Sequence, residues 1–164
     1  MLKMRFELLV LAAIFFISCS NSYNNVGDIA FDPATDNSDF KVCNENRILQ
    51  YYNFGKGLMY HGEKFEILEH LNQHFKASEA PEINGYLTVR FIVNCNGETG
   101  RFRTSEMDLN YQEIQFDQDL KGQLLELTKE LNKWQIGKRE DSSFDYYQYL
   151  TYKIEGGQLT DIMP

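Results

Sequence analysis

The chain has 164 residues, which suits one ordinary domain but is too short for two once its ends are set aside. Apolar residues make up 43% of the sequence and aromatic residues 14%, a composition typical of a folded globular domain and not of a disordered chain. The formal net charge of −8 argues against nucleic acid and against an anionic membrane surface as partners, because both attract cationic proteins.

Residues 1–18 have the features of an export signal. Lys3 and Arg5 precede an apolar run from Leu8 to Ile17. This run has the length of a signal-peptide core and is much shorter than the roughly 20 residues that cross a bilayer. We therefore expect a cleaved leader and not a transmembrane helix.

The segment Phe16 to Cys19 resembles the lipobox of bacterial lipoproteins, in which a small residue directly precedes the cysteine. Ser18 is that small residue, whereas Phe16 stands where the family usually has leucine. The resemblance implies cleavage between Ser18 and Cys19, a diacylglyceryl group on the Cys19 thiol, and acylation of the new amino terminus. Such acyl chains would be the membrane contact of the protein. The alternative is an ordinary signal peptide in which Cys19 is incidental.

The residue after the cysteine bears on location. In the sorting rule known for some bacterial lipoproteins, Asp at that position favours the inner membrane, and this chain has Ser20. We therefore expect a protein of the cell envelope, anchored in the outer membrane and facing the periplasm or the cell surface.

Residues 19–42 are dominated by Ser, Asn and Asp without an apolar period, so we expect a polar tether there and one domain over residues 43–164. With Cys19 assigned to lipid, Cys43 and Cys95 remain. An even remainder in an oxidising compartment predicts one disulfide, worth about 4 kcal/mol for a loop of roughly fifty residues. The alternative is a pair of buried thiols.

The first half of the domain predicts a helix followed by a hairpin. After a weak strand pattern over Arg47–Phe54, helical spacing runs over Glu63–Lys76. Its apolar face carries Phe65, Leu68, Leu71 and Phe75, with Ile67 beside them. Alternation of apolar side chains then predicts a strand over Gly85–Asn94. The Asn- and Gly-rich turn after it leads back into a strand over Arg101–Ser105.

The second half predicts a helix and two more strands. An apolar stripe joins Phe116, Leu120, Leu124, Leu127, Leu131 and Trp134, with Gly137 as the stop. Strands are expected over Phe144–Ile154 and Gln158–Ile162, separated by a Gly-Gly turn. The order α-β-β-α-β-β predicts a two-layer α+β domain, an antiparallel sheet with both helices on one face.

Several spaced motifs resemble the carboxy-terminal domain of TonB. They are the segment Tyr60–Lys64, the strand Asn84–Val93, the turn residues Asn96-Gly97 and the segment Lys133–Gly137, where Ile136 replaces the family's Pro. The resemblance implies a TonB-like fold and a peptide-binding mode at a sheet edge. We expect neither TonB's transmembrane anchor nor its Pro-rich spacer, and so no energy transduction.

No motif predicts chemistry. His70 and His74 stand four residues apart, as two ligands of one metal can, but no Glu-flanked motif accompanies them and a solvated helix flank explains them. No nucleophile elbow or phosphate-binding loop is present in the sequence. We therefore expect a protein that is not an enzyme and has no catalytic residues, no cofactor and no metal.

Candidate binding residues lie on the sheet face opposite the helices. Alternation places there Tyr86, Arg90, Arg101, Arg103, Tyr147, Tyr149 and Lys153. Tyr and Arg are enriched at protein interfaces, so this face predicts a binding or assembly module for an extended peptide or protein partner. Two alternatives remain: a merely solvated face, and a structural envelope-maintenance lipoprotein without a specific ligand.

The two faces of the expected sheet predict different mutational effects. Trp134 should pack against the sheet near Phe91, so that Trp134→Ala is costly, whereas Tyr147→Ala on an open face should be nearly neutral.

Overall fold

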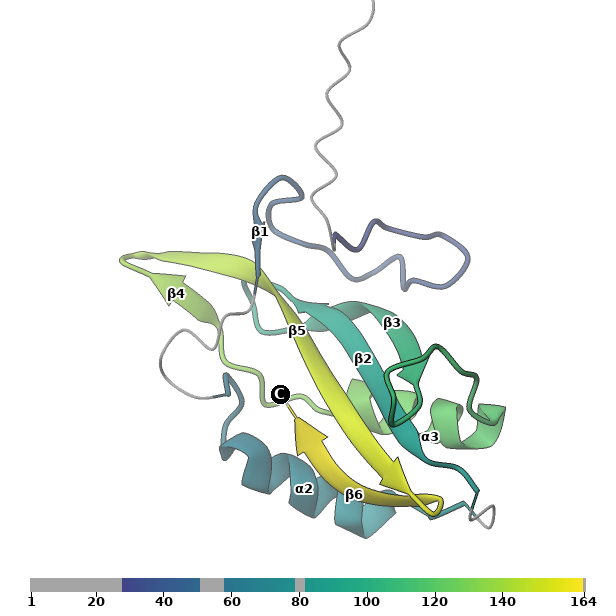
Figure 1. Cartoon of the computed structure of the whole chain (residues 1–164). Helices are drawn as coiled ribbons and strands as arrows, with labels where there is room; N and C mark the ends of the chain where they lie inside the picture. The colour runs from purple at the N-terminus through teal and green to yellow at the C-terminus, as the bar shows by residue number, and fades with distance from the viewer. Residues whose placement is uncertain (1–27, 51–57, 79–81, 164) are drawn as a thin grey trace, which may run out of the picture.

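The computed structural model describes residues 28–50, 58–78 and 82–163. The predicted leader, Cys19 and the second half of the weak strand pattern at 47–54 lie outside the described residues. In the described part, a twisted open sheet of six strands packs against two helices (Figure 1). The α+β class is confirmed. Neither helix in this part of the chain is long and apolar enough to cross a membrane.

Three long strands form the centre of the sheet. The strand β2 (Gly85–Val93) pairs antiparallel with β3 (Thr99–Met107) on one side and with β5 (Ser142–Glu155) on the other. Their β-branched, aromatic and alternating side chains give one buried face along β2, as the sequence predicts. The hairpin and both long strands are confirmed.

Three short strands complete the sheet through pairings with β5. The predicted last strand is β6 (Gln158–Met163), which is antiparallel to β5. A short strand that the sequence did not predict, β4 (Gly137–Arg139), forms a hairpin with the start of β5. The strand β1 (Ile48–Leu49) runs parallel to β5, so the expectation of an all-antiparallel sheet is wrong. Strands of two or three residues are too short to show a period.

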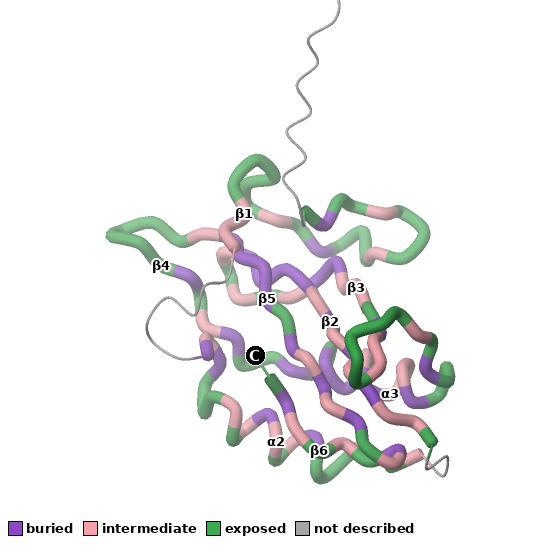
Figure 2. Tube along the Cα trace, viewed as in Figure 1, coloured by how far each residue is buried: buried purple, intermediate pink, exposed green. Residues whose placement is uncertain are grey.

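Both helices lie on the same face of the sheet. Ile67 of α2 (Glu63–His74) and Leu124 of α3 (Gln118–Lys129) belong to one core cluster with Val89 of β2. Figure 2 shows the resulting buried stripe along the middle strands and the inner sides of the helices. The two-layer arrangement follows from helices that are each apolar on one side only.

The helices differ in detail from the predicted ones. Trp134 lies beyond the end of α3, and its backbone forms a bridge with Tyr60. Because α3 ends at Lys129, Gly137 does not stop this helix and is instead the first residue of β4. Phe65 is 74% exposed on α2, although helical spacing places it on the apolar face, because Ile67 occupies the core instead. Trp134 packs edge-on to Phe91 at 5.1 Å between ring centroids, as expected.

A β-bulge interrupts the pairing of β3 with β2. Arg90 pairs with Arg103 and Ile92 pairs with Gly100, so Arg101 and Phe102 together oppose one residue of β2. Arg101 adopts a left-handed backbone with φ of 54°. The extra residue turns Phe102 toward the helices and leaves both neighbouring arginines on the other side, which is called the outer face below.

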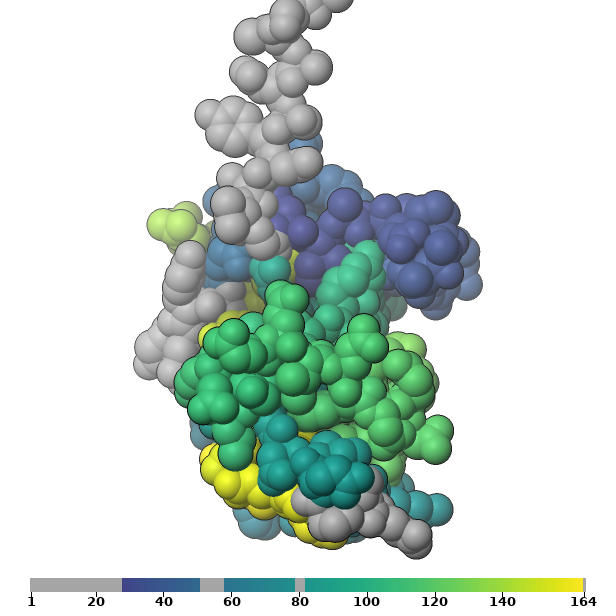
Figure 3. Space-filling model, turned by 45° about the vertical axis from the view of Figure 1, so that its right-hand side comes forward, coloured from purple at the N-terminus to yellow at the C-terminus, as the bar shows by residue number. Residues whose placement is uncertain are grey.

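Residues 28–50, called the N-terminal segment below, lie across one end of the outer face (Figure 1). Its residues Ile29 and Phe40 form a second core cluster with Ile92 and Tyr147 of the sheet. A Cβ on Gly100 would lie 2.3 Å from the ring of Phe40, so a glycine allows this close approach. In Figure 3 the purple and blue atoms of this segment lie directly against the teal and green atoms of the domain.

The tether prediction is therefore wrong for residues 28–42, which pack on the domain. The apolar residues of this stretch are few and irregularly spaced, and their partners lie far away in the chain. A periodicity argument does not detect such packing.

Candidate functional site

The predicted disulfide joins the N-terminal segment to the turn after β2. Cys43 and Cys95 are bridged, with their Cα atoms 6.1 Å apart and a sequence separation of 52. The carboxylate of Asp145 lies beside the bridge and accepts the backbone N–H groups of Asn44 and Cys95 at 2.8 Å each. Because both sulfurs are in the bridge, the cluster of Cys43, Cys95 and Asp145 acts as a clamp and offers no thiolate for a metal.

Two predicted binding residues are buried by the N-terminal segment. The hydroxyl of Tyr147 accepts the backbone N–H of Ile29 at 3.3 Å and donates to Asp28 at 3.2 Å. Arg101 donates to the carbonyl of Ile29 at 3.2 Å and forms an ion pair with Glu45. Burial raises the pKa of the Tyr147 hydroxyl.

Two further predicted residues also bind this segment. Arg103 makes a bidentate ion pair with Asp36, at 2.7 and 2.8 Å, and donates to the carbonyl of Ala30 at 2.9 Å. The hydrogen bonds from Arg103 lower the pKa of Asp36. Arg90 donates to the side-chain oxygen of Gln50 at 3.2 Å and lies over the ring of Tyr147 at 4.6 Å.

The prediction of an open surface is thus wrong for Arg101 and Tyr147, which are buried, whereas Arg90 and Arg103 are half-buried beside the N-terminal segment. Alternation assigned these side chains to the correct face of the sheet. It does not reveal that a distant part of the same chain covers that face.

Tyr86, Tyr149 and Lys153 lie on the other half of the outer face. Tyr86 stacks on Tyr111, with ring centroids 5.5 Å apart and planes within 5° of parallel. Tyr149 is exposed, and Lys153 pairs with Glu155 at 2.9 Å. The seven predicted residues therefore form two groups, one in contact with the N-terminal segment and one on the half of the face that the segment leaves uncovered.

A shallow groove of about 290 Å³ occupies this half of the face. We call it the outer groove; its lining consists of Tyr86, Thr88, Met107, Tyr111, Thr151 and Met163. Across its floor the hydroxyl groups of Thr88 and Thr151 are 2.9 Å apart and hydrogen-bonded to each other. The groove combines aromatic, thioether and hydroxyl groups, which suits contact with a peptide chain.

Tyr111 is the most prominent residue of the outer groove, and the sequence analysis missed it. Its side chain is 70% exposed and its backbone φ is 62°. Asp108 holds this turn, because its carboxylate accepts the N–H groups of Asn110 and Gln112 and its carbonyl accepts that of Tyr111. A left-handed tyrosine is unfavourable, so the turn holds an exposed ring at a local cost. The turn-forming Asp108 is the signal that points to it.

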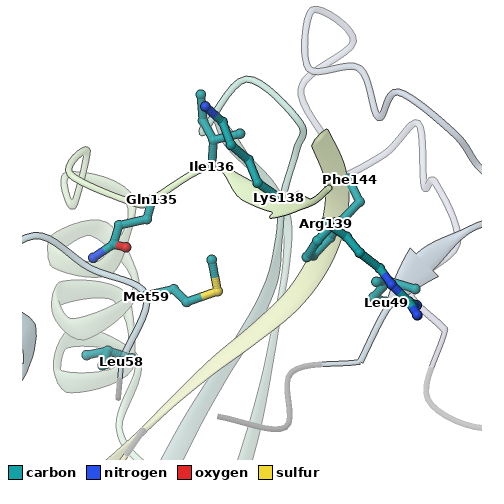
Figure 4. Close-up of a pocket in the computed structure, with 8 residues that line it drawn as sticks. All are labelled: Leu49, Leu58, Met59, Gln135, Ile136, Lys138, Arg139 and Phe144. Atoms are coloured by element: carbon teal, nitrogen blue, oxygen red, sulfur yellow. The ribbon is translucent and has the colours of Figure 1, made fainter. Parts of the chain in front are cut away.

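A second concave region lies at the end of the sheet where β1, β4 and β5 meet (Figure 4). We call it the end pocket; its volume is about 420 Å³, and it is lined by Leu49, Leu58, Met59, Gln135, Ile136, Lys138, Arg139 and Phe144. A polar pocket of about 480 Å³ adjoins it and shares Leu49, Arg139 and Phe144 with it.

The two histidines on α2 face different groups. His70 directs Nε2 toward Glu130 at 3.3 Å, and His74 has Nδ1 2.8 Å from the backbone carbonyl of His70. Their rings pack at 4.7 Å between centroids. The carbonyl contact accounts for one ring nitrogen of His74, whereas Nε2 of His70 lies near Glu130 without a hydrogen bond.

Comparisons with protein-family models, with curated proteins and with solved structures found no match to this chain. The functional argument therefore rests on the residues and on their geometry.

Proposed function

We propose that the protein is a lipid-anchored envelope protein whose domain binds an extended peptide or protein partner at the outer groove, without catalysing a reaction. The observation that carries the proposal is the stacked pair Tyr86 and Tyr111, which presents an exposed aromatic surface in a strained turn. Exposed aromatic rings held in place are typical of binding surfaces, because the contact area is available without ordering the side chain.

The size of the outer groove favours a peptide over an enclosed small molecule. Its volume of about 290 Å³ is at the lower limit of ordinary small-molecule sites, and it is open to solvent. The strand β6 forms one side of the described sheet, and Met163 at its end lines the groove. A peptide that added to this edge would place alternate side chains over the groove.

The resemblance to the TonB carboxy-terminal domain supports the same binding mode and stays part of the proposal. The order of hairpin, second helix and long strand is shared with the motifs quoted above. The N-terminal segment, the parallel β1 and the short β4 have no counterpart in those motifs.

A structural envelope-maintenance role without a specific ligand is the second candidate. One observation favours it: Arg101 and Tyr147, two of the predicted binding residues, are engaged by the chain itself. Their interface-like chemistry is then explained by intramolecular packing.

The binding proposal is tested by quantitative capture of partners from envelope extracts. Tyr111→Asn removes the ring and keeps a residue that tolerates the left-handed backbone. Phe65→Ala is the matched control, since it removes another exposed aromatic ring from α2, away from the groove. A stoichiometric partner should be lost with Tyr111→Asn and retained with Phe65→Ala. Equal recovery with both variants would favour the structural role.

Lipid anchoring is tested by Cys19→Ser, because the thiol of Cys19 is the atom that would take the diacylglyceryl group. The parent protein should partition into the detergent phase and the variant should be soluble or unprocessed. An unchanged membrane fraction would contradict the lipoprotein assignment. Recovery of the parent in outer-membrane fractions tests the expected sorting, and equal recovery from the inner membrane would count against it.

A further inference from the structure

The end pocket has an apolar interior. Leu49 of β1 and Phe144 of β5 form one wall, and Leu58 and Met59 form the opposite one. In Figure 4 the side chain of Met59 extends into the space between these walls, and Ile136 lies at its rim. A volume of about 420 Å³ is within the usual range of ligand sites.

This interior adjoins a polar pocket whose lining includes two arginines. The adjoining pocket shares Arg139 with the end pocket and adds Arg47, Ser142 and Ser143, which are hydrogen-bond donors. Lys138 lines the end pocket beside Arg139. An apolar cavity that continues into a donor-rich one matches a ligand with an apolar tail and an anionic head.

The cations of this region form no ion pair with a described carboxylate, a property they share with Lys41, Lys76 and Arg90 but not with the seven lysines and arginines that are ion-paired. Arg47, Lys138 and Arg139 have no carboxylate within 4.0 Å in the part of the chain that the structure describes. By contrast, Lys64 pairs with Asp161 at 2.6 Å and Lys153 pairs with Glu155 at 2.9 Å, although both lie at the surface. In a chain of net charge −8, three cations without such partners at one pocket favour an anionic ligand.

The two acidic residues of the polar pocket offset part of this charge, and the linings of the two pockets together hold three cations and two carboxylates. Asp145 already accepts two backbone N–H groups and is buried. Glu140 is exposed in the turn between β4 and β5. Arg139 and Arg47 therefore retain donors for a head group.

We propose that the end pocket binds a single-chain fatty acid, with the alkyl chain among Leu49, Met59 and Phe144 and the carboxylate at Arg139 and Arg47. Each methylene group that leaves water adds up to about fourfold in affinity. A carboxylate matches the fork of an arginine. The site is separate from the outer groove and does not depend on the function proposed there.

The ligand class is tested by calorimetric titration of the purified full chain with probes below their micelle concentrations. Laurate should bind with one-to-one stoichiometry. Octanoate, which has four fewer methylene groups, should bind at least about tenfold more weakly, and dodecyltrimethylammonium should also bind at least about tenfold more weakly. Absence of laurate binding, or equal binding of the cationic probe, would overturn the proposal. Tighter binding of dodecyl phosphate than of laurate would reassign the head group and overturn the fatty-acid assignment.

Variants locate the site. Arg139→Gln should weaken laurate binding by about fivefold, and Ile136→Asp, which places a charge at the apolar rim, by about tenfold or more. Lys76→Gln is the matched control, because Lys76 is another cation and lies beyond the far end of α2. Thermal melts establish that each variant is folded, and Arg47→Gln replaces Arg139→Gln if the latter is not. Unchanged affinity in a folded head-group variant rejects the site, whereas Tyr111→Asn should leave laurate binding intact.

Discussion

The hydroxyl of Tyr147 accepts the backbone N–H of Ile29 at 3.3 Å, which joins the long strand β5 to a residue 118 positions earlier in the chain. The contact is enclosed by a small cluster of Ile29, Phe40, Ile92 and Tyr147. The domain therefore has two apolar cores, one on each face of the sheet, and the N-terminal segment forms part of the second.

Replacing Tyr147 tests this second core. Tyr147 is 2% exposed and Trp134 is 4% exposed, so Tyr147→Ala and Trp134→Ala should each lower the free energy of unfolding by about 3–5 kcal/mol in urea denaturation. Tyr149→Ala, on the same face but exposed, is the control and should cost much less. A nearly neutral Tyr147→Ala, as the sequence alone suggested, would show that the segment does not pack there in solution.

Two glycine substitutions should have opposite effects. Gly100→Ala places a methyl group against the ring of Phe40 and should destabilise the domain by about 1–3 kcal/mol. Gly122→Ala lies in α3 with no atom within 4 Å of the added carbon, so it should stabilise the domain by about 0.5–1 kcal/mol. Thermal denaturation distinguishes them; a stabilising Gly100→Ala would contradict the close approach of Phe40.

Removal of the disulfide should weaken the fold without changing its topology. In the chain-entropy model, the double variant Cys43→Ser with Cys95→Ser should lose about 4 kcal/mol, because its unfolded chain is no longer cross-linked. The wild-type protein unfolded in a thiol reductant should give the same midpoint as the variant. A variant as stable as the oxidised protein would mean that the bridge contributes nothing.

Acid should loosen the N-terminal segment through Asp36. Its pKa is lowered by Arg103, so the stabilisation from this pair is complete above the ordinary aspartate pKa of 3.8 and is lost as the pH falls through the lower folded value. At neutral pH, Asp36→Asn should cost about 1–2 kcal/mol. The stability difference between the variant and the parent should shrink below pH 4. If the stability difference stays constant down to pH 2, protonation of Asp36 does not weaken its pair with Arg103.

The sequence predicted the features whose patterns are local and long enough. The alternation over residues 85–93 identified β2 and its buried side, and an even remainder of cysteines identified the bridge between Cys43 and Cys95. The order of the helices and of the long strands also followed from periodicity.

Features that depend on distant partners were not predictable in this way. The apolar residues Ile29 and Phe40 are eleven positions apart and have no period, so their burial follows only from the sheet they contact. Tyr111 lies in a loop, where exposure of an aromatic ring depends on the turn that Asp108 forms. The candidate binding surface is therefore the half of the outer face beside Tyr86, and not the half that the N-terminal segment covers.

The position of Asp28 in the chain limits how far the domain can lie from a bilayer. Asp28 is already fixed to Tyr147, and it lies only nine residues after Cys19. Nine residues extend at most about 30 Å. If Cys19 carries lipid, this short connection keeps the domain close to the lipid headgroups. The strand β1, which belongs to the N-terminal segment, would then lie close enough to the bilayer to meet molecules that leave the membrane.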